Sequence, residues 1–207
     1  MAIVIEHKGL ATDQAAVKRT FDFLLAAVGL VLSSWLIVLA WVAASWDTRS
    51  NGFFVQQRVG KNGRLFNVVK IKTMRPSRVL DTTVTRSGDP RITPLGRLLR
   101  KAKIDELPQL WNVLWGDMSF VGPRPDVPGF ADSLVGEERQ LLSIRPGITG
   151  PATLKYRNEE ELLAAAEDPE VYNREVIWPD KVSINLEYIR DWRLSKDLQY
   201  IWKTVMG

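Results

Sequence analysis

An uninterrupted apolar run lies near the N-terminus of the chain. Between Asp22 and Asp47 stand twenty-four residues without a charge, FLLAAVGLVLSSWLIVLAWVAASW. At about 1.5 Å per residue, a straight helix of this length reaches roughly 36 Å, which is enough to cross a bilayer core of about 30 Å. The run is too long and starts too late for a typical signal peptide, although Val42-Ala43-Ala44 would pass as a weak cleavage site. The pattern therefore predicts a helix inserted in a membrane.

The charges around this run leave its topology open. Lys18 and Arg19 precede it, and the basic residues that follow it are Arg49, Arg58, Lys61 and Arg64. Basic residues on both sides give the positive-inside rule no asymmetry to act on. A single span and a hairpin that enters and leaves by the same leaflet are both compatible with this pattern. Ser33-Ser34 would allow the hairpin, because a serine hydroxyl can bond to a carbonyl one turn back and bend a helix.

The pattern then changes to alternation. Residues 53–74, FFVQQRVGKNGRLFNVVKIKTM, predict two strands around a Gly60-Lys61-Asn62-Gly63 turn. Period-two alternation places Lys70 and Lys72 on one face of the second strand, opposite Val69 and Ile71. The polar residues 75–92 predict a loop, after which Thr93-Pro94 supplies an N-cap and a first-turn proline for a helix.

A helical period returns in residues 103–125, KIDELPQLWNVLWGDMSFVGPRP. The apolar residues Leu107, Leu110, Trp111 and Leu114 predict an amphipathic helix, in which proline is tolerated only in the first turn. Two adjacent acids, Asp105 and Glu106, would then lie at or near its N-terminus.

Further helices are predicted for residues 159–170 and about 181–205. The second of these predicted helices carries apolar side chains at steps of three and four residues, with basic residues between them. These apolar side chains are Tyr188, Trp192, Leu194, Leu198, Ile201, Trp202 and Val205. Such a helix could lie along a bilayer surface or pack on the domain core.

Charge is concentrated in one part of the chain. The net charge is +4, but residues 58–103 hold thirteen Lys or Arg against Asp81 and Asp89, a local charge of +11 that leaves −7 for the remainder. Such a block favours an anionic partner, whether phosphate, nucleic acid or an anionic bilayer, although a solvated basic face is the alternative. Cysteine is absent and His7 is the one histidine, which argues against disulfides, thiolate chemistry and zinc sites.

The remaining candidates for chemistry are carboxylates and basic side chains, because the sequence has no phosphate-binding glycine loop, H-E-x-x-H, G-x-S-x-G or D-x-D motif. Adjacent helical residues point about 100° apart, so Asp105 and Glu106 would have separate roles. A carboxylate can act as a covalent nucleophile, and a helix N-terminus favours anions. Arg100 and Arg124 could clamp phosphate oxygens. A capping Asp followed by a first-turn Glu is the purely structural interpretation.

Four segments in order carry a family resemblance: KRTFDFLLA, FNVVKIKTM, DPRITPLGRLLRKAKIDELPQLWNVLWGDMSFVGPRP and RPGITGPA. From about Lys18 to the C-terminus, the chain resembles the bacterial sugar transferases called monotopic phosphoglycosyl transferases, in their small form that consists of the catalytic core.

The resemblance implies a reaction at the cytoplasmic face of the bacterial inner membrane. A sugar 1-phosphate passes from a UDP-sugar to polyprenyl phosphate, usually undecaprenyl phosphate, with Mg²⁺ as cofactor and UMP as the leaving group. The product starts a surface glycan or glycoconjugate. The partners implied are these two substrates and the phospholipid bilayer, without nucleic acid.

The resemblance also implies roles for individual residues. Asp105 matches the nucleophile that forms an aspartyl-phosphosugar intermediate, and it would also contact Mg²⁺. Glu106 matches a supporting acid that acts in proton transfer or organises the metal. Arg100 and Arg124 match arginines near the phosphates, and Lys72 and Arg145 are weaker candidates of the same kind.

The fold implied is α+β: an N-terminal re-entrant membrane helix-hairpin, a small β-hairpin and several amphipathic interfacial helices in one domain that rests on the membrane. Residues 1–47 would form the N-terminal segment with the membrane helix, and residues 48–207 the catalytic domain. The family commonly bends the membrane helix at Ser-Pro, whereas Ser34-Trp35 stands here. The rival interpretations are a membrane-anchored anion-binding protein without turnover and a transferase of the bare sugar, which would release UDP.

Overall fold

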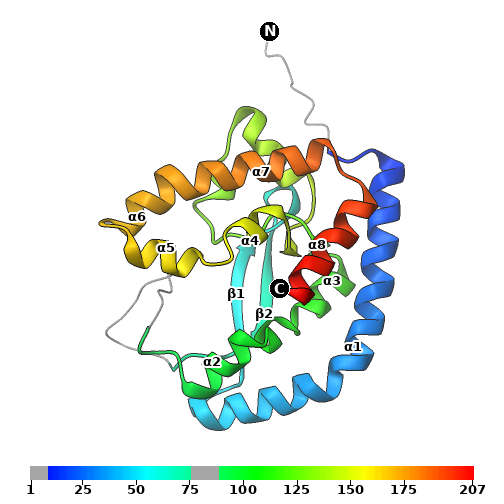
Figure 1. Cartoon of the computed structure of the whole chain (residues 1–207). Helices are drawn as coiled ribbons and strands as arrows, with labels where there is room; N and C mark the ends of the chain where they lie inside the picture. The colour runs from blue at the N-terminus through cyan, green and yellow to red at the C-terminus, as the bar shows by residue number, and fades with distance from the viewer. Residues whose placement is uncertain (1–8, 76–88) are drawn as a thin grey trace.

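The first element is a long bent helix. The computed structural model describes residues 9–75 and 89–207. Helix α1 (Thr12–Thr48) is one continuous helix of 37 residues rather than two helices joined by a turn. Figure 1 shows it running down one side of the molecule and then along the lower edge. Near its middle, Ser33 donates to the carbonyl of Gly29 (2.7 Å) and Ser34 to that of Val31 (3.0 Å), so two serines supply the bonds that favour bending in the absence of proline.

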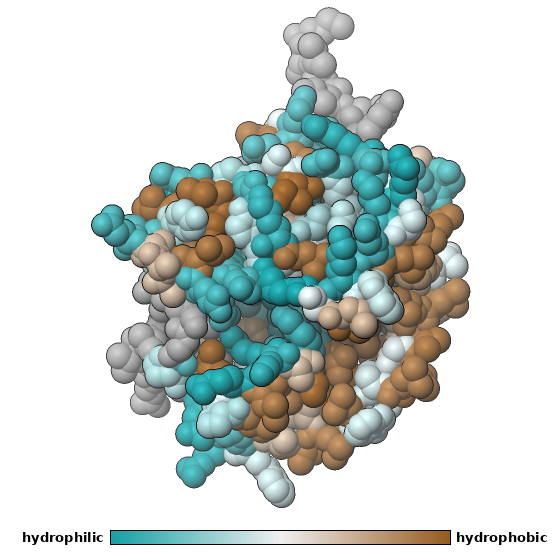
Figure 2. Space-filling view, in the orientation of Figure 1, coloured by the Kyte–Doolittle hydropathy of each residue, from teal (hydrophilic) through white to brown (hydrophobic). Residues whose placement is uncertain are grey.

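One stripe of α1 faces the rest of the protein. Its buried members recur at steps of four residues in each half of the helix: Lys18, Asp22, Ala26, Ala40, Ala44 and Thr48. The opposite face exposes large apolar side chains, and Figure 2 shows a hydrophobic surface along the side and lower edge that α1 occupies. Among the described residues, α1 is the one helix long and apolar enough to cross a membrane, and little of its apolar stretch is buried inside the protein. This surface is consistent with the membrane association predicted from the sequence.

The predicted β-hairpin is confirmed. Strands β1 (Phe53–Val59) and β2 (Leu65–Ile71) pair antiparallel, with Phe53 opposite Ile71 and Val59 opposite Leu65. The turn between them contains the short helix η1 (Lys61–Gly63). A second small sheet pairs β3 (Ser119–Val121) parallel to β4 (Gly147–Thr149).

The segment that holds the acidic pair is only partly as predicted. Helix α2 (Pro94–Lys101) is capped by the Thr93 hydroxyl, which accepts from the amide of Gly96 at 2.8 Å, as the sequence predicts. The predicted amphipathic helix is shorter than expected: α3 spans Gln109–Trp115, and Pro108 is its N-cap residue. Asp105 and Glu106 lie in a preceding 3-10 turn, η2 (Ile104–Glu106), because the chain tightens before the proline. The predicted loop 75–92 lies largely outside the described residues.

The C-terminal part is helical, with one break that the sequence did not reveal. Its α-helices are α4 (Pro151–Lys155), α5 (Glu159–Ala165), α6 (Pro169–Tyr172), α7 (Trp178–Arg190) and α8 (Leu194–Met206). The other helical segments are the 3-10 helices η3 (Ala131–Ser133) and η4 (Gly136–Ser143) and the π-helix η5 (Asn173–Ile177). The chain breaks between α7 and α8, and packing on the core is confirmed for part of the final apolar stripe, whereas its position along a bilayer surface stays a prediction. Tyr188 and Trp192 are in the core, whereas Leu198, Trp202 and Val205 on α8 are exposed.

The core joins α1 to the hairpin and so fixes the acidic turn. Ala26 of α1 packs with Val68, Val113 and Met118. In the second half of α1, the partners of Ala40 and Ala44 are Ile71 and Leu99. Both halves of the bent helix thus contact the domain. The division of the chain after residue 47 falls next to the end of α1 and stays a prediction.

Candidate active site

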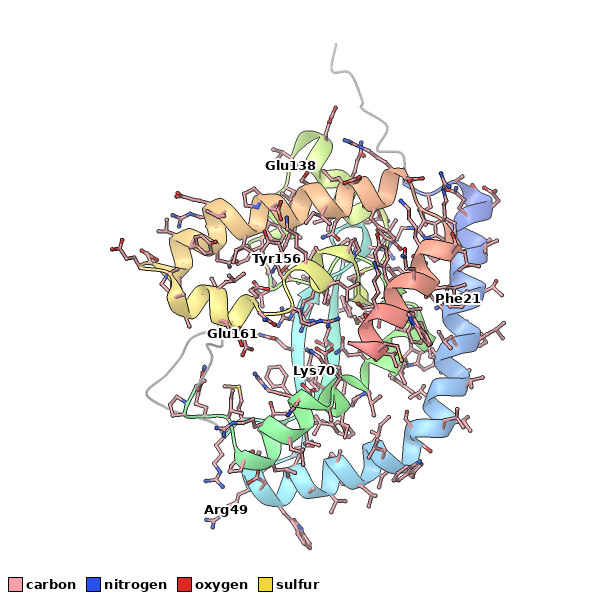
Figure 3. All side chains as sticks on the ribbon, viewed as in Figure 1. Phe21, Arg49, Lys70, Glu138, Tyr156 and Glu161 are labelled. Carbon is pink, nitrogen blue, oxygen red and sulfur yellow. The ribbon has the colours of Figure 1, made fainter. Side chains whose placement is uncertain are left out.

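The acidic turn is held between α2, α3 and the hairpin. Lys103 has a left-handed backbone (φ 57°, ψ 17°) that ends the preceding helical segment and redirects the chain into η2. On the other side, Asn112 fixes α3 to β2: its Oδ1 accepts from the amide of Val69 (3.2 Å) and its Nδ2 donates to the carbonyl of Asn67 (2.7 Å). These contacts place η2 beside Lys70, which Figure 3 labels next to the green segment that contains the turn.

Glu106 is an ion-paired carboxylate. Its Oε1 lies 3.0 Å from Lys70 Nζ and 3.0 Å from Arg124 Nη2, and its side chain is 13% exposed. Burial alone would raise the pKa of Glu106, but Arg124, Lys70 and Lys103 outweigh it and hold the pKa far below its usual range. Glu106 therefore stays ionised at any physiological pH, and it is suited to holding two cations in place.

Asp105 is a carboxylate of the opposite kind. The residue is 9% exposed, and its buried Oδ1 has no hydrogen-bond partner. Burial raises the pKa of Asp105 and the charge of Glu106 adds to the rise, against Lys70, Arg100 and Lys103, which lower it. A buried carboxylate oxygen without a partner is rare in folded proteins, and perturbed carboxylates gather at functional sites. Asp105 thus has an oxygen available for a ligand or for reaction.

Two arginines predicted for phosphate binding lie around this pair. Arg124 is 46% exposed on its side chain, and the charge of Glu106 raises its pKa. Arg100 is oriented by the Thr73 hydroxyl (3.0 Å to Nε) and by Met74 Sδ (3.3 Å to Nη2). The structure therefore brings together Asp105, Glu106 and Arg124, with Arg100 close enough to favour the ionised form of Asp105.

The other two predicted phosphate ligands form hydrogen bonds outside this cluster. The Lys72 amine donates to Ser50 Oγ at 2.9 Å rather than to either acid. Arg145 donates from Nε to the carbonyl of Gly116 at 2.6 Å and lines a separate cavity with Lys18 and Lys61. The family motif pointed to both residues, but their distance from Asp105 depends on packing that the motif does not encode.

Sequence reasoning missed three residues of the site. Lys70 was placed on the strand face of Lys72 but was not assigned to the acids. Gln109, the first residue of α3, is buried with its Nε2 unpartnered. Burial raises the pKa of Asp126 to about 6, against the charges of Lys181, Arg58 and Arg124. Its position directly after the Arg124 loop was the available signal for Asp126, whereas nothing local indicated that Gln109 would be buried.

The carboxylates of the site fit a Mg²⁺ ion that is bound partly by the protein and partly by the substrate. Among residues 9–75 and 89–207, no three acidic or histidine side chains gather to form a metal cage. Mg²⁺ is commonly bound by one or two carboxylates together with substrate phosphates and water. Asp105, with its unpartnered Oδ1, fits that arrangement, whereas Glu106 is engaged by two cations.

Comparison with known proteins defines the class. Residues 13–207 match the family model of the bacterial sugar transferases. The exopolysaccharide production protein ExoY of Rhizobium meliloti is 32% identical over 204 residues, which cover 91% of this chain and 83% of that protein. The chain therefore belongs to the bacterial sugar transferase family, and the resemblance to phosphoglycosyl transferases is confirmed.

Relatives named for a reaction are equally similar. The UDP-glucose:undecaprenyl-phosphate glucose-1-phosphate transferase of Caulobacter vibrioides is 35% identical over 192 residues, covering 91% of this chain and 68% of that protein. The undecaprenyl-phosphate galactose phosphotransferase of Salmonella typhimurium is 32% identical over 222 residues, covering 99% of this chain and 43% of that protein. These relatives act on different sugars, so similarity at this level does not identify the sugar.

Proposed function

We propose that this chain transfers a sugar 1-phosphate from a UDP-sugar to polyprenyl phosphate and releases UMP, with Asp105 as the covalent nucleophile. The observation that carries the proposal is the buried, unpartnered Oδ1 of Asp105 beside a fully ion-paired Glu106. Membership of the sugar transferase family and the reactions for which the relatives are named support the reaction class.

The first half-reaction forms the covalent intermediate. A carboxylate oxygen of Asp105 attacks the β-phosphorus of the UDP-sugar, and the bond from that phosphorus to the bridging oxygen of UMP breaks. UMP leaves with the bonding electron pair, and the sugar 1-phosphate stays on Asp105 as a mixed anhydride. Burial of Asp105 supports this role, because a poorly solvated carboxylate is a stronger nucleophile than one in water.

The second half-reaction regenerates the enzyme. A phosphate oxygen of polyprenyl phosphate attacks the same phosphorus, the bond to Asp105 breaks, and the polyprenyl diphospho-sugar leaves. Division into two steps means that the site never has to hold both anionic substrates together.

The neighbours of Asp105 have electrostatic roles. Glu106 fixes Lys70 and Arg124, so their positive charges are oriented before the substrate arrives, which is the efficient form of electrostatic catalysis. The half-exposed guanidinium of Arg124 and the nearby Arg100 are suited to contact the diphosphate. Asp105 would hold Mg²⁺ together with the substrate phosphates, and the ion when bound would offset phosphate charge and polarise the phosphorus.

The membrane arrangement supports access to a lipid substrate. Residues near the two ends of α1 contact the domain, because Lys18 forms an ion pair with Asp197 and Ala44 packs with Ile71 and Leu99. The helix bends between these two contacts (Figure 1). A helix anchored in this way would enter and leave the bilayer on the same, cytoplasmic side. A re-entrant arrangement would bring the acidic turn to the level where the head group of polyprenyl phosphate emerges.

The test is nucleotide release by the full chain in nanodiscs with undecaprenyl phosphate, Mg²⁺ and a panel of UDP-sugars. UMP release that requires Mg²⁺ is expected, whereas UDP release would indicate transfer of the bare sugar. No turnover together with salt-sensitive anion binding would favour the membrane-anchored binding protein. The control is Glu160→Gln, which removes a half-exposed carboxylate that forms an ion pair with Arg100 at 3.4 Å.

Topology has an independent test, since the chain lacks cysteine. Single variants Thr12→Cys and Glu138→Cys lie at exposed positions before the apolar run and in the domain. Both should react with an impermeant thiol reagent from the same side of the membrane. Reaction from opposite sides would contradict the re-entrant arrangement.

A further inference from the structure

A second cavity lies away from the acidic turn. It encloses about 320 Å³, and its polar lining includes Lys18, Asp22, Lys61, Ser119, Ser143 and Arg145. None of these residues contacts Asp105 or Glu106. Lys61 is in the turn of the hairpin, whereas Lys70 lies near the opposite end of β2. Lys70 lies six steps along the strand from Arg64, or roughly 20 Å at about 3.3 Å per step, so the cavity is a separate site.

Two cations that line the cavity have no ion-pair partner among the described residues. Lys18 is neutralised by Asp197 at 2.6 Å, but neither Lys61 nor Arg145 forms an ion pair within the part of the chain that the structure describes. Burial lowers the pKa of Lys61, and the charge of Arg145 lowers it further. Burial also lowers the pKa of Arg145, Arg19 adds to the effect, and Asp22 and Asp117 oppose it. With Lys18 neutralised by Asp197, the lining holds two further cations, Lys61 and Arg145, against the one carboxylate of Asp22, and these two cations repel each other.

Hydrogen-bonding capacity is also unused there. The hydroxyl of Ser143 is buried and has no partner. Arg145 uses Nε on the carbonyl of Gly116, which leaves its two terminal nitrogens without a hydrogen bond in the described residues. A tetrahedral anion could accept from the Arg145 fork, the Lys61 amine and the Ser143 hydroxyl, and it would relieve the repulsion between the two cations.

The cavity lies next to the membrane-facing surface. Gly116, whose carbonyl holds Arg145, follows Trp115, which is 69% exposed. Arg19 donates to the carbonyls of Val113 and Leu114 and lies over the ring of Phe23, the first residue of the apolar run. The cationic lining is therefore at the level where the polar start of α1 gives way to its apolar surface.

We infer that Lys61, Arg145 and Ser143 form a second phosphate-binding site, distinct from the Asp105 site, at the membrane-proximal end of the hairpin turn. A volume of about 320 Å³ is in the range of small-ligand pockets and accommodates a phosphodiester head group as well as free phosphate. The bound phosphate neutralises the cationic pair and, when it belongs to an anionic lipid, ties this end of the domain to the bilayer.

The experiment measures occupancy at the cavity itself. Ala15 lines the cavity, whereas Ala16 is exposed and points elsewhere on the same turn of α1. Single variants Ala15→Cys and Ala16→Cys of the full chain are treated with a maleimide, in detergent with or without inorganic phosphate, and in nanodiscs of phosphatidylglycerol or phosphatidylcholine. Occupancy should slow the reaction of Ala15→Cys at least threefold and leave that of Ala16→Cys unchanged.

Charge variants then identify the ligand contacts. Lys61→Gln should abolish the slowing, Lys61→Arg should retain it, and Arg64→Gln should retain it because Arg64 is on the same turn but not in the lining. Slowing by inorganic phosphate alone assigns the site to free phosphate, and slowing in phosphatidylglycerol alone assigns it to a lipid head group; both support the proposal. No slowing in either arm, or equal effects of Lys61→Gln and Arg64→Gln, overturns it. The readout requires no turnover, so it is independent of UMP release.

Discussion

Asp105 and Asp197 are both buried carboxylates, but their surroundings are opposite. Asp197 is fully buried and accepts three hydrogen bonds: from Lys18 Nζ (2.6 Å), Tyr188 OH (2.6 Å) and Trp192 Nε1 (3.1 Å). Asp105 is almost as buried, yet one of its oxygens has no donor. Burial of a charge is tolerated when the charge is paired and hydrogen-bonded, so Asp197 is a structural residue that ties α1 to α8. The hydrogen bonding of Asp105 is incomplete, and we expect the substrate to supply the missing partner.

The comparison is tested most strongly by Asp105→Asn. The amide keeps the shape of the side chain but cannot form the phosphoanhydride, so UMP release should fall by about 10³-fold or more. Thermal stability should stay the same or rise, because the substitution removes a buried charge that the folded state disfavours at neutral pH. Turnover at the normal rate would show that Asp105 is not the nucleophile.

The reverse pattern is expected for Asp197→Ala. Its removal leaves Lys18 buried without a partner, and loss of one member of a buried ion pair costs about 3–5 kcal/mol of unfolding free energy. The control is Asp191→Ala, which removes exposed ion pairs with Arg193 and Lys196 and should cost far less, because water screens exposed charges. Denaturant unfolding of both variants in detergent measures the difference. Equal losses would mean that Asp197 is no more structural than a surface carboxylate.

Glu106→Gln should combine a smaller loss of stability with a loss of activity. The amide leaves Lys70 and Arg124 without their counter-charge, which we expect to cost about 1–3 kcal/mol and to lower turnover about 10- to 100-fold. Unfolding and UMP release are measured on the same preparation. A variant with full activity and unchanged stability would remove Glu106 from the site.

The smallest expected effect is a shift in the pH profile of turnover. Turnover requires ionised Asp105, and the raised pKa of this residue places the acid limb of the pH profile above the usual carboxyl pKa of about 4.

The free energy of unfolding also depends on pH through the two acids. The stabilising contribution of Asp105, whose folded-state pKa is raised, is present below its unfolded-state pKa and is lost as the pH rises through its folded-state pKa. The contribution of Glu106, whose folded pKa is lowered, is present above its unfolded pKa and lost as the pH falls.

Burial also raises the pKa of Asp126, to about 6, so the contribution of Asp126 to the pH profile of turnover must be separated from that of Asp105. Asp126→Asn should leave the acid limb of kcat in place if that limb belongs to Asp105. Disappearance of the limb in this variant would assign it to Asp126 instead.

The sequence revealed the local features and missed those that depend on packing. Alternation and the Gly60-Lys61-Asn62-Gly63 turn predicted the hairpin, and Thr93-Pro94 predicted the start of α2, because both signals act within a few residues. The start of α3 was misplaced since Pro108 caps the helix after a 3-10 turn rather than lying inside its first turn. The identity of the acidic pair came from the motif block.

The environments of the two acids could not be predicted. They depend on Lys70, which is 36 positions from Glu106, and on the burial of Asp105 under α1 and the hairpin. For the same reason the separation of Arg145 from Asp105 was not foreseen, although RPGITGPA pointed to its importance.

The most direct measurement is the intact mass of the full chain after incubation with a UDP-sugar and Mg²⁺ in the absence of polyprenyl phosphate, followed by peptide mapping. The account predicts an added sugar phosphate on wild-type protein, located on Asp105, absent from Asp105→Asn and removed when polyprenyl phosphate is supplied. An adduct on another residue, or UMP release at the full rate with no adduct on rapidly quenched protein, would contradict it.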